Sequence, residues 1–216
     1  MKQAVLLAFV VGCAILESTP AQTRTNLTKS PEEIEAAYRQ AIEKRTADIL
    51  SVLELKDPTK SSKVHDILIV QYCALRDWHD ANDLKLKRAT GDQAAQINSS
   101  LKALHDKFIS GLAAELTPEQ VEKVKDKMTY NKVQVTYDAY LEIVPNLTEP
   151  QKKKILNLLK EAREEAMDAG SVDEKSAIFK KYKGRINNYL TAEGHNVKQA
   201  YKDWGEKQKA GKDSNQ

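Results

Sequence analysis

This 216-residue chain has few cysteines, no large excess of positive or negative charge and no long apolar run. Each of these shortages excludes a class of protein. If Cys13 is removed with a signal peptide, Cys73 is the only cysteine left, and it cannot close an intramolecular disulfide. The 34 basic and 31 acidic residues are interspersed and leave a net charge of +3, which argues against nucleic acid as a partner. No apolar run reaches the roughly 20 residues of a membrane-spanning helix. Packing of apolar side chains must therefore hold the mature fold.

Motifs for catalysis and metal binding are missing as well. The chain has no Gly-x-Ser-x-Gly elbow, no glycine-rich phosphate loop and no cysteine in a nucleophile motif. With 31 acidic residues, mostly expected on helix exteriors, no carboxylate pair stands out as a general acid and base. His65, His79 and His105 each precede an aspartate, but neighbouring helical residues point about 100° apart and cannot share one metal ion. The sequence predicts a protein that is not an enzyme, with no metal and no cofactor.

The first 21 residues have the features of a signal peptide. Lys2 is a short basic region, Ala4 to Leu16 is apolar, and Thr19-Pro20-Ala21 offers small residues for cleavage. Val10-Val11-Gly12-Cys13 resembles a lipobox, although the apolar run continues past Cys13, where a lipoprotein would turn polar. We therefore expect an exported, periplasmic or extracellular protein without a transmembrane segment, and a lipid anchor at Cys13 is the alternative.

Apolar residues recur with helical period along the rest of the chain. Ser30-Pro31-Glu32-Glu33 supplies an N-cap, a first-turn proline and a capping-box glutamate for a helix that we expect to reach about Leu55. Residues 133–144 mix β-branched and aromatic side chains, and we interpret them as a short helix because a lone strand would have no partner. The sequence predicts an all-α, single-domain bundle of seven or eight helices over residues 30–206, after a polar leader (22–29) and before a disordered tail (207–216).

Two segments offer groups for binding. The run from Arg76 to Asp83 is polar and aromatic, and Asp83 lies four residues after His79, so its carboxylate can orient the imidazole. The alternative is a solvated helix face.

The second half of the chain is rich in aromatic rings that can stack on sugars or, alternatively, fill the core. These rings are Tyr130, Tyr137, Tyr140, Tyr182, Tyr189, Tyr201 and Trp204.

Several motifs resemble those of a secreted bacterial family of unknown function that is described as sugar-binding. They are Thr136-Tyr137-Asp138-Ala139-Tyr140-Leu141, Pro145-Asn146-Leu147-Thr148, Glu161-Ala162-Arg163-Glu164, Ala166-Met167-Asp168-Ala169-Gly170-Ser171, Glu174-Lys175 and Lys181-Tyr182-Lys183-Gly184-Arg185-Ile186-Asn187-Asn188-Tyr189-Leu190. That family occurs among exported proteins of polysaccharide-degrading bacteria. The resemblance implies an oligosaccharide or polysaccharide as the partner and supplies no catalytic residues.

Aromatic, amide and charged side chains cluster around the expected helix ends at Gly170 and Gly194. We expect this cluster to line a surface cleft that binds the carbohydrate. Its members are Tyr140, Asp168, Lys183, Arg185, Asn187, Asn188 and Tyr189.

A second, shorter resemblance concerns the pattern Leu-Thr-x-x-Gln. It occurs at Leu116–Gln120 and Leu147–Gln151, 31 residues apart, and is similar to elements of small periplasmic chaperones that sense envelope stress. Two capping boxes alone would produce the same pattern. An ATP-independent chaperone and a structural component of an envelope complex are therefore the alternatives to carbohydrate binding.

Overall fold

The computed structural model describes residues 30–213, and the expected signal peptide, leader and Cys13 lie outside this range. The described residues form helices and no strand, which confirms the all-α prediction, including a helix over the β-branched segment near residue 135. None of these helices is both long and apolar enough to cross a bilayer. The helices are α1 (Pro31–Leu50), α2 (Pro58–Leu86), α3 (Asp92–Glu115), α4 (Pro118–Met128), α5 (Lys132–Ile143), α6 (Glu149–Met167), α7 (Val172–Ala192) and α8 (Val197–Asp213).

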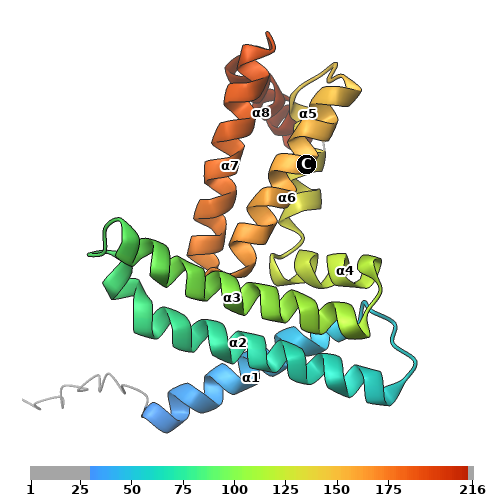
Figure 1. Cartoon of the computed structure of the whole chain (residues 1–216). Helices are drawn as coiled ribbons and strands as arrows, with labels where there is room; N and C mark the ends of the chain where they lie inside the picture. Colours follow the sequence, from blue (N-terminus) through green and yellow to red (C-terminus); the bar gives the residue numbers. More distant parts are fainter. Residues whose placement is uncertain (1–29, 214–216) are drawn as a thin grey trace, which may run out of the picture.

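The helices form two groups within one domain (Figure 1). In the first group α2 lies between α1 and α3, and α4 packs on α1 and α3. In the second group α6 and α7 lie along each other and stand roughly upright on the first group, α5 lies beside α6, and α8 packs on α5 and α7 at the far end (Figure 1). The contact of α4 with α6 connects the groups.

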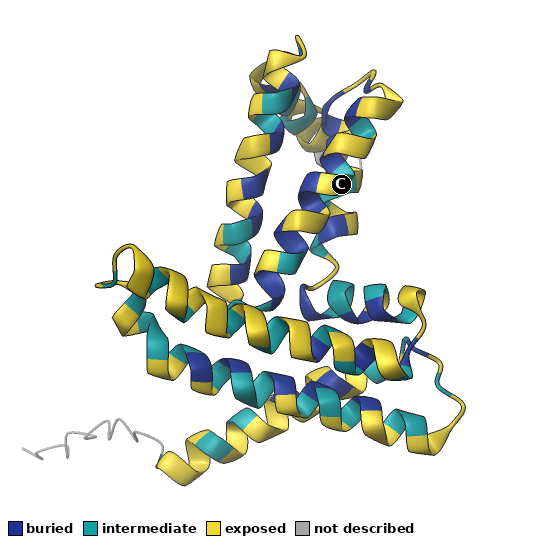
Figure 2. Cartoon of the chain, viewed as in Figure 1, coloured by how far each residue is buried: buried dark blue, intermediate teal, exposed yellow. Residues whose placement is uncertain are grey.

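Each group has its own apolar core, and buried positions recur along the helices of both groups (Figure 2). The N-terminal core is built around fully buried side chains such as Val64, Leu68 and Leu112. The C-terminal core is built around Ile155, Leu159 and Ile186. Met167, at the end of α6, belongs to the N-terminal core, so α6 contributes to both interiors.

Capping boxes begin three of the helices, as the sequence predicts. Ser30, Thr117 and Thr148 each accept a hydrogen bond from the backbone N–H three residues later, and the Glu or Gln at that position accepts one from the cap's own N–H. The Leu-Thr-x-x-Gln pattern therefore has a complete local explanation. Gln120 also donates to the carbonyl of Leu53, which ties the start of α4 to the end of the α1 region.

Two expected boundaries are wrong. The first helix ends at Leu50 rather than near Leu55, because turns follow and Glu54 adopts a φ of +52°, which brings Leu53 into the N-terminal core. The tail expected to be disordered from Lys207 continues α8 to Asp213. This segment contains the helix-favouring residues lysine, glutamine and alanine, and propensity outweighs its polar character.

Candidate functional site

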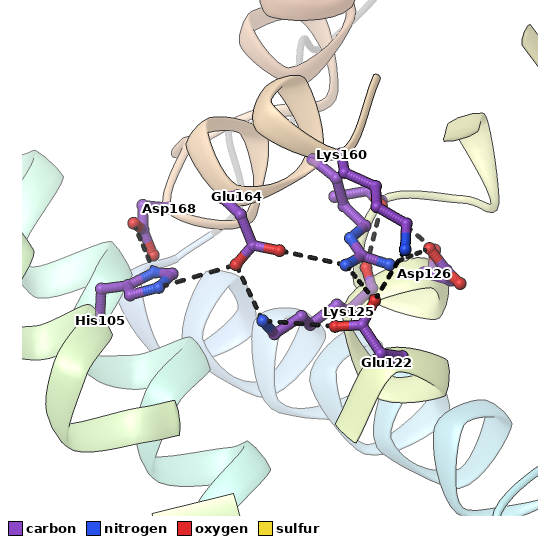
Figure 3. Close-up of polar contacts among 9 residues, drawn as sticks. His105, Glu122, Lys125, Asp126, Lys160, Glu164 and Asp168 are labelled. Carbon is purple, nitrogen blue, oxygen red and sulfur yellow. Dashed lines mark hydrogen bonds and ion pairs between the residues drawn. The ribbon is translucent and has the colours of Figure 1, made fainter. Parts of the chain in front are cut away.

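Ion pairs join the two groups of helices where α6 meets α4 (Figure 3). The Arg163 side chain on α6 is 3% exposed, and it donates to Asp126 Oδ1 at 2.7 Å and to Glu122 Oε2 at 2.6 Å, both on α4. Lys125 Nζ on α4 lies 3.0 Å from Glu164 Oε2 on α6. Since hydrogen bonds between charged groups are strong and directional, this network fixes α6 on α4.

Asp168, the C-cap of α6, extends this joint to α2 and α3. His105 Nδ1 on α3 lies 2.9 Å from Asp168 Oδ2, and His79 Nε2 on α2 lies 2.7 Å from the Asp168 carbonyl oxygen. The other ring nitrogen of His79 lies 2.9 Å from Asp83 Oδ1, which confirms the expected orientation of this imidazole by Asp83. Both nitrogens of His79 therefore face acceptors.

The partners of these two histidines favour the imidazolium form. The hydrogen bond to Asp168 raises the pKa of His105 above its ordinary value, although burial opposes the shift. Burial also lowers the pKa of His79, but the Asp168 carbonyl and Asp83 outweigh it and the net shift is upward. Because both pKa values are raised, the joint gains positive charge at α2 and α3 at a higher pH than free imidazole groups would.

A cleft opens beside the joint, between α1, α2 and the turns that precede α5 and α7. It consists of two adjoining cavities of about 150 and 290 Å³ that share Arg45, Tyr72, Tyr130 and Lys175 as lining residues. Together they reach the lower end of the roughly 300–1,000 Å³ typical of ligand sites. We call this feature the tyrosine–arginine cleft.

Cation–aromatic contacts build the wall of the tyrosine–arginine cleft on α1 and α2. The Arg76 guanidinium lies 4.4 Å from the centre of the Tyr38 ring, and Arg45 lies 6.0 Å from the centre of the Tyr72 ring. The Tyr38 hydroxyl donates to the Tyr72 carbonyl at 2.7 Å. Such contacts hold flat rings and planar cations in fixed orientations at the cavity surface.

Lys175 on α7 provides a buried ammonium group for the same cleft. Its Nζ donates to the carbonyl oxygens of Ala166 at 2.8 Å and Met167 at 3.3 Å, which are the last carbonyls of α6. Burial lowers the pKa of Lys175 to about 8, and the charge of Arg45 acts in the same direction. A lysine with a lowered pKa in a cleft is a feature of functional sites.

The two turns at the tyrosine–arginine cleft constrain their residues in different ways. Tyr130 and Asn131, between α4 and α5, have φ angles of +59° and +54°, and left-handed residues other than glycine are strained. Before α7, a Cβ on Gly170 would come within 2.8 Å of the His79 ring. Gly170 is therefore needed for close approach and not, as in a usual helix stop, for a positive φ, whereas Gly194 has a φ of +93°.

The seven residues expected to bind a ligand do not share one surface. Asp168 lies before the start of α7, whereas the five expected residues from Lys183 to Tyr189 lie in the second half of that helix. The separation along the helix axis is on the order of 20 Å. Tyr140 is 1% exposed, and its hydroxyl donates to Asn187 Oδ1 at 2.7 Å and lies 3.2 Å from the Lys183 carbonyl. The structure brings these three together as a packing contact between α5 and α7.

The remaining expected site residues lie on the surface of α7. Arg185 lies 4.5 Å from the centre of the Tyr182 ring and 3.2 Å from Glu161 Oε2. Asn188 is exposed, and Tyr189 packs against the C-terminal core with part of its ring accessible. A role for these residues in binding stays a prediction.

Sequence reasoning missed most of the tyrosine–arginine cleft. None of the sequence motifs contains Tyr38, Arg45 or Tyr72, and Lys175 occurs only in the Glu174-Lys175 pair of the family resemblance. The one useful signal was the polar and aromatic run on α2, because Arg76, His79 and Asp80 all line the smaller cavity. Tyr38, Arg45 and Tyr72 meet where α1 packs on α2, and Lys175 joins them because α7 stands on the first group.

A larger cavity of about 450 Å³ lies at the other end of α7, between the turns before α6 and α8. Trp204, His195 and Glu142 line it, and Trp204 Nε1 donates to Glu142 Oε2 at 3.3 Å. No buried charged group lines this cavity, in contrast to the tyrosine–arginine cleft.

Comparison with known proteins places the chain in a family but gives no activity. Among residues 30–213, no three histidine, cysteine or carboxylate side chains are grouped so that they could hold a metal ion. No curated protein matches the chain. The model of one family, described as "Protein of unknown function (DUF3826)", matches residues 39–210. The chain therefore belongs to this DUF3826 family of unknown function.

Proposed function

We propose that this protein is an exported, non-catalytic carbohydrate-binding protein, and that the tyrosine–arginine cleft holds the saccharide. One observation carries the proposal: the rings of Tyr38, Tyr72 and Tyr130 line the same cleft as the cations of Arg45 and Lys175. Tyrosine offers a flat apolar face and a polar tip, which suits the C–H face and the hydroxyl groups of a sugar ring.

The rigidity of the tyrosine–arginine cleft supports a binding role. Tyr38 and Tyr72 are connected by a hydrogen bond, and each carries a guanidinium group against its ring. A pre-formed site loses little conformational entropy when a ligand binds. Tyr130 is the most accessible of the three rings, at 44% exposure, and lies where a sugar would enter.

Calorimetric titration with pectic and hemicellulosic oligosaccharides tests the proposal. We expect binding that weakens about tenfold or more in Tyr130→Ala, because aromatic contacts often dominate binding energy. Tyr189→Ala and Arg185→Ala are matched controls on the outer face of α7, and we expect both to bind like the wild type. No heat with any saccharide contradicts the proposal, and a loss confined to the two α7 variants moves the site to that face.

An ATP-independent chaperone is the second candidate. A mainly apolar cavity of about 360 Å³ opens in the angle between α2–α3 and α6–α7, with Trp78, Leu86, Leu101 and Ile178 among its lining residues. Apolar concavities of this kind bind unfolded segments. Suppression of light scattering by an aggregating client protein tests this function, and its loss in Leu101→Asp would support it over carbohydrate binding.

A further inference from the structure

Arg45 is one of three cations at the cleft, with Lys127 and Lys175, that form no ion pair within residues 30–213. It is exposed on α1 and lines both cavities, and no Asp or Glu among residues 30–213 lies within ion-pair distance of it. By contrast, Arg76 on the same wall has two carboxylate partners. Glu35 Oε2 lies 2.7 Å and Asp77 Oδ1 lies 3.0 Å from its guanidinium. Arg45 is therefore available to an incoming anion, whereas Arg76 is already neutralised.

Lys175 also forms no ion pair within the described residues, and it lines both cavities together with Arg45. Its two hydrogen bonds go to carbonyl oxygens, and the charge of Arg45 is one cause of its lowered pKa. Asp168 and Glu174 act on Lys175 in the opposite sense without reaching ion-pair distance. Two cations that repel each other across a cavity create an electrostatic cost, which an anion between them would remove.

The negative charge around this point comes from carboxylates that form no ion pair with Arg45 or Lys175. The start of α7, with Gly170, Ser171 and Val172, lines the smaller cavity and brings the positive end of a helix dipole. Asp80 lines the smaller cavity and Asp48 the larger one, and neither has an ion pair with Arg45 or Lys175. The cleft is thus complementary to an anion at one point and to sugar rings around it.

We infer that the saccharide bound in the tyrosine–arginine cleft is acidic, and that its carboxylate or sulfate ester binds between Arg45 and Lys175. This inference rests on the proposed carbohydrate-binding function and specifies its ligand. A guanidinium group binds a planar carboxylate through two parallel hydrogen bonds, and an ammonium group acts as a point charge behind it. The tyrosine rings then contact the sugar that carries the anion.

Matched ligands separate the charge from the sugar. The probes are trigalacturonate with its methyl ester, a glucuronate-substituted xylo-oligosaccharide with its methyl ester, and a sulfated galacto-oligosaccharide with its desulfated form. We expect at least one acidic probe to bind tenfold or more tightly than its neutral counterpart, which corresponds to about 1.4 kcal/mol. The arm that shows this preference identifies the carboxylate or the sulfate ester as the anion.

Variants assign the preference to the two cations. We expect Arg45→Gln to abolish it, Arg45→Lys to keep part of it, and Lys44→Gln, an exposed neighbour on the same helix, to leave it unchanged. Binding of an anion beside Lys175 favours its protonated form, so at pH 8.5 binding by the wild type should take up protons. The dependence of the binding enthalpy on buffer ionisation measures this uptake, which requires no unfolding-prone variant.

Three outcomes decide the matter. Equal affinity for every acidic probe and its neutral counterpart overturns the inference and leaves carbohydrate binding intact. A preference for acidic probes that survives in Arg45→Gln, without proton uptake at pH 8.5, also overturns it. Absence of binding to any probe, acidic or neutral, overturns both the inference and the proposed function.

Discussion

The two groups of helices use tyrosine in opposite ways. In the C-terminal group Tyr140 and Tyr182 are buried, at 1% and 8% exposure, and fill the core between α5, α6 and α7. In the N-terminal group Tyr38 and Tyr72 are only partly buried and line the tyrosine–arginine cleft. Contact with arginine does not separate the two sets, since Arg185 also lies against the Tyr182 ring. A cluster of tyrosines in the sequence therefore does not locate a binding site, because the helix surface that each ring occupies decides its role.

Substitution of one tyrosine from each set gives the largest contrast. We expect Tyr140→Ala to lower the free energy of unfolding by about 3–5 kcal/mol, because it empties a buried aromatic site and removes the hydrogen bond to Asn187. Tyr130→Ala should change stability by no more than about 0.5 kcal/mol, since this ring is 44% exposed. Urea unfolding of both variants measures the difference, and equal losses would contradict the division of tyrosines into core and cleft.

The joint between the two groups is built differently from either interior. Both cores are apolar, whereas α6 meets α4 through Arg163, Lys125 and their carboxylate partners (Figure 3). The joint carries a desolvation cost, because Arg163 Nε is buried and has no hydrogen-bond partner among the described residues. Ion pairs at such a joint fix orientation more than they add stability.

Arg163→Met tests whether this joint holds the two groups together. We expect Arg163→Met to lower the free energy of unfolding by about 3 kcal/mol. Breaking a buried ion pair costs roughly 3–5 kcal/mol, and the lower end applies because the carboxylates left behind are partly exposed. Arg185→Met is the matched control, since its ion pair with Glu161 is exposed and should contribute less than about 1 kcal/mol. Unfolding followed by circular dichroism gives both values. Equal small losses would show that apolar contacts alone fix α6 on α4.

The sequence predicted the parts of this molecule that depend on neighbours along the chain. The helices, the capping boxes at Ser30, Thr117 and Thr148 and the contact of His79 with Asp83 all follow from spacings of three or four residues. The tyrosine–arginine cleft was missed because its members come from α1, α2, the α4–α5 turn and α7. Periodicity gives the buried face of each helix but not the angle at which two groups of helices meet.

The expected ligand site shows the same limit. Tyr140 and Asn187 meet through buried packing beside the Lys183 carbonyl and not at a surface cleft. The partners of Asp168 are histidines from α2 and α3, which are far from it in the sequence. Grouping by chemistry gives residue types but not their surroundings, and ligand binding by these residues stays a prediction.

The pH dependence of the free energy of unfolding tests the contribution of His105 to the joint. The pKa of His105 is raised in the folded protein, so its contribution to stability is fully present below the unfolded value near 6.5 and is lost as the pH rises through the folded value above it. We expect His105→Gln to cost about 1.5–3 kcal/mol near pH 5.5, the range for a hydrogen bond to a charged group, and progressively less above pH 6.5. Urea unfolding across this range measures it. In the Asp168→Asn background the pH dependence should become much smaller, with a remainder from Glu164 Oε2 at 3.9 Å from His105 Nε2, and an undiminished pH dependence would contradict the assignment of Asp168 as the main partner.

The smallest effect compares the same motif in both groups. Thr117 caps α4 in the N-terminal group and Thr148 caps α6 in the C-terminal group, each within a capping box. We expect Thr117→Ala and Thr148→Ala each to cost about 1 kcal/mol, because each removes one side-chain acceptor for a helix N–H. Hydrogen exchange should show the loss of protection at the start of the substituted helix, with Thr191→Ala on the exposed face of α7 as a control. A loss of protection that spreads through both groups would mean that these caps act on the joint and not, as the local geometry indicates, on one helix.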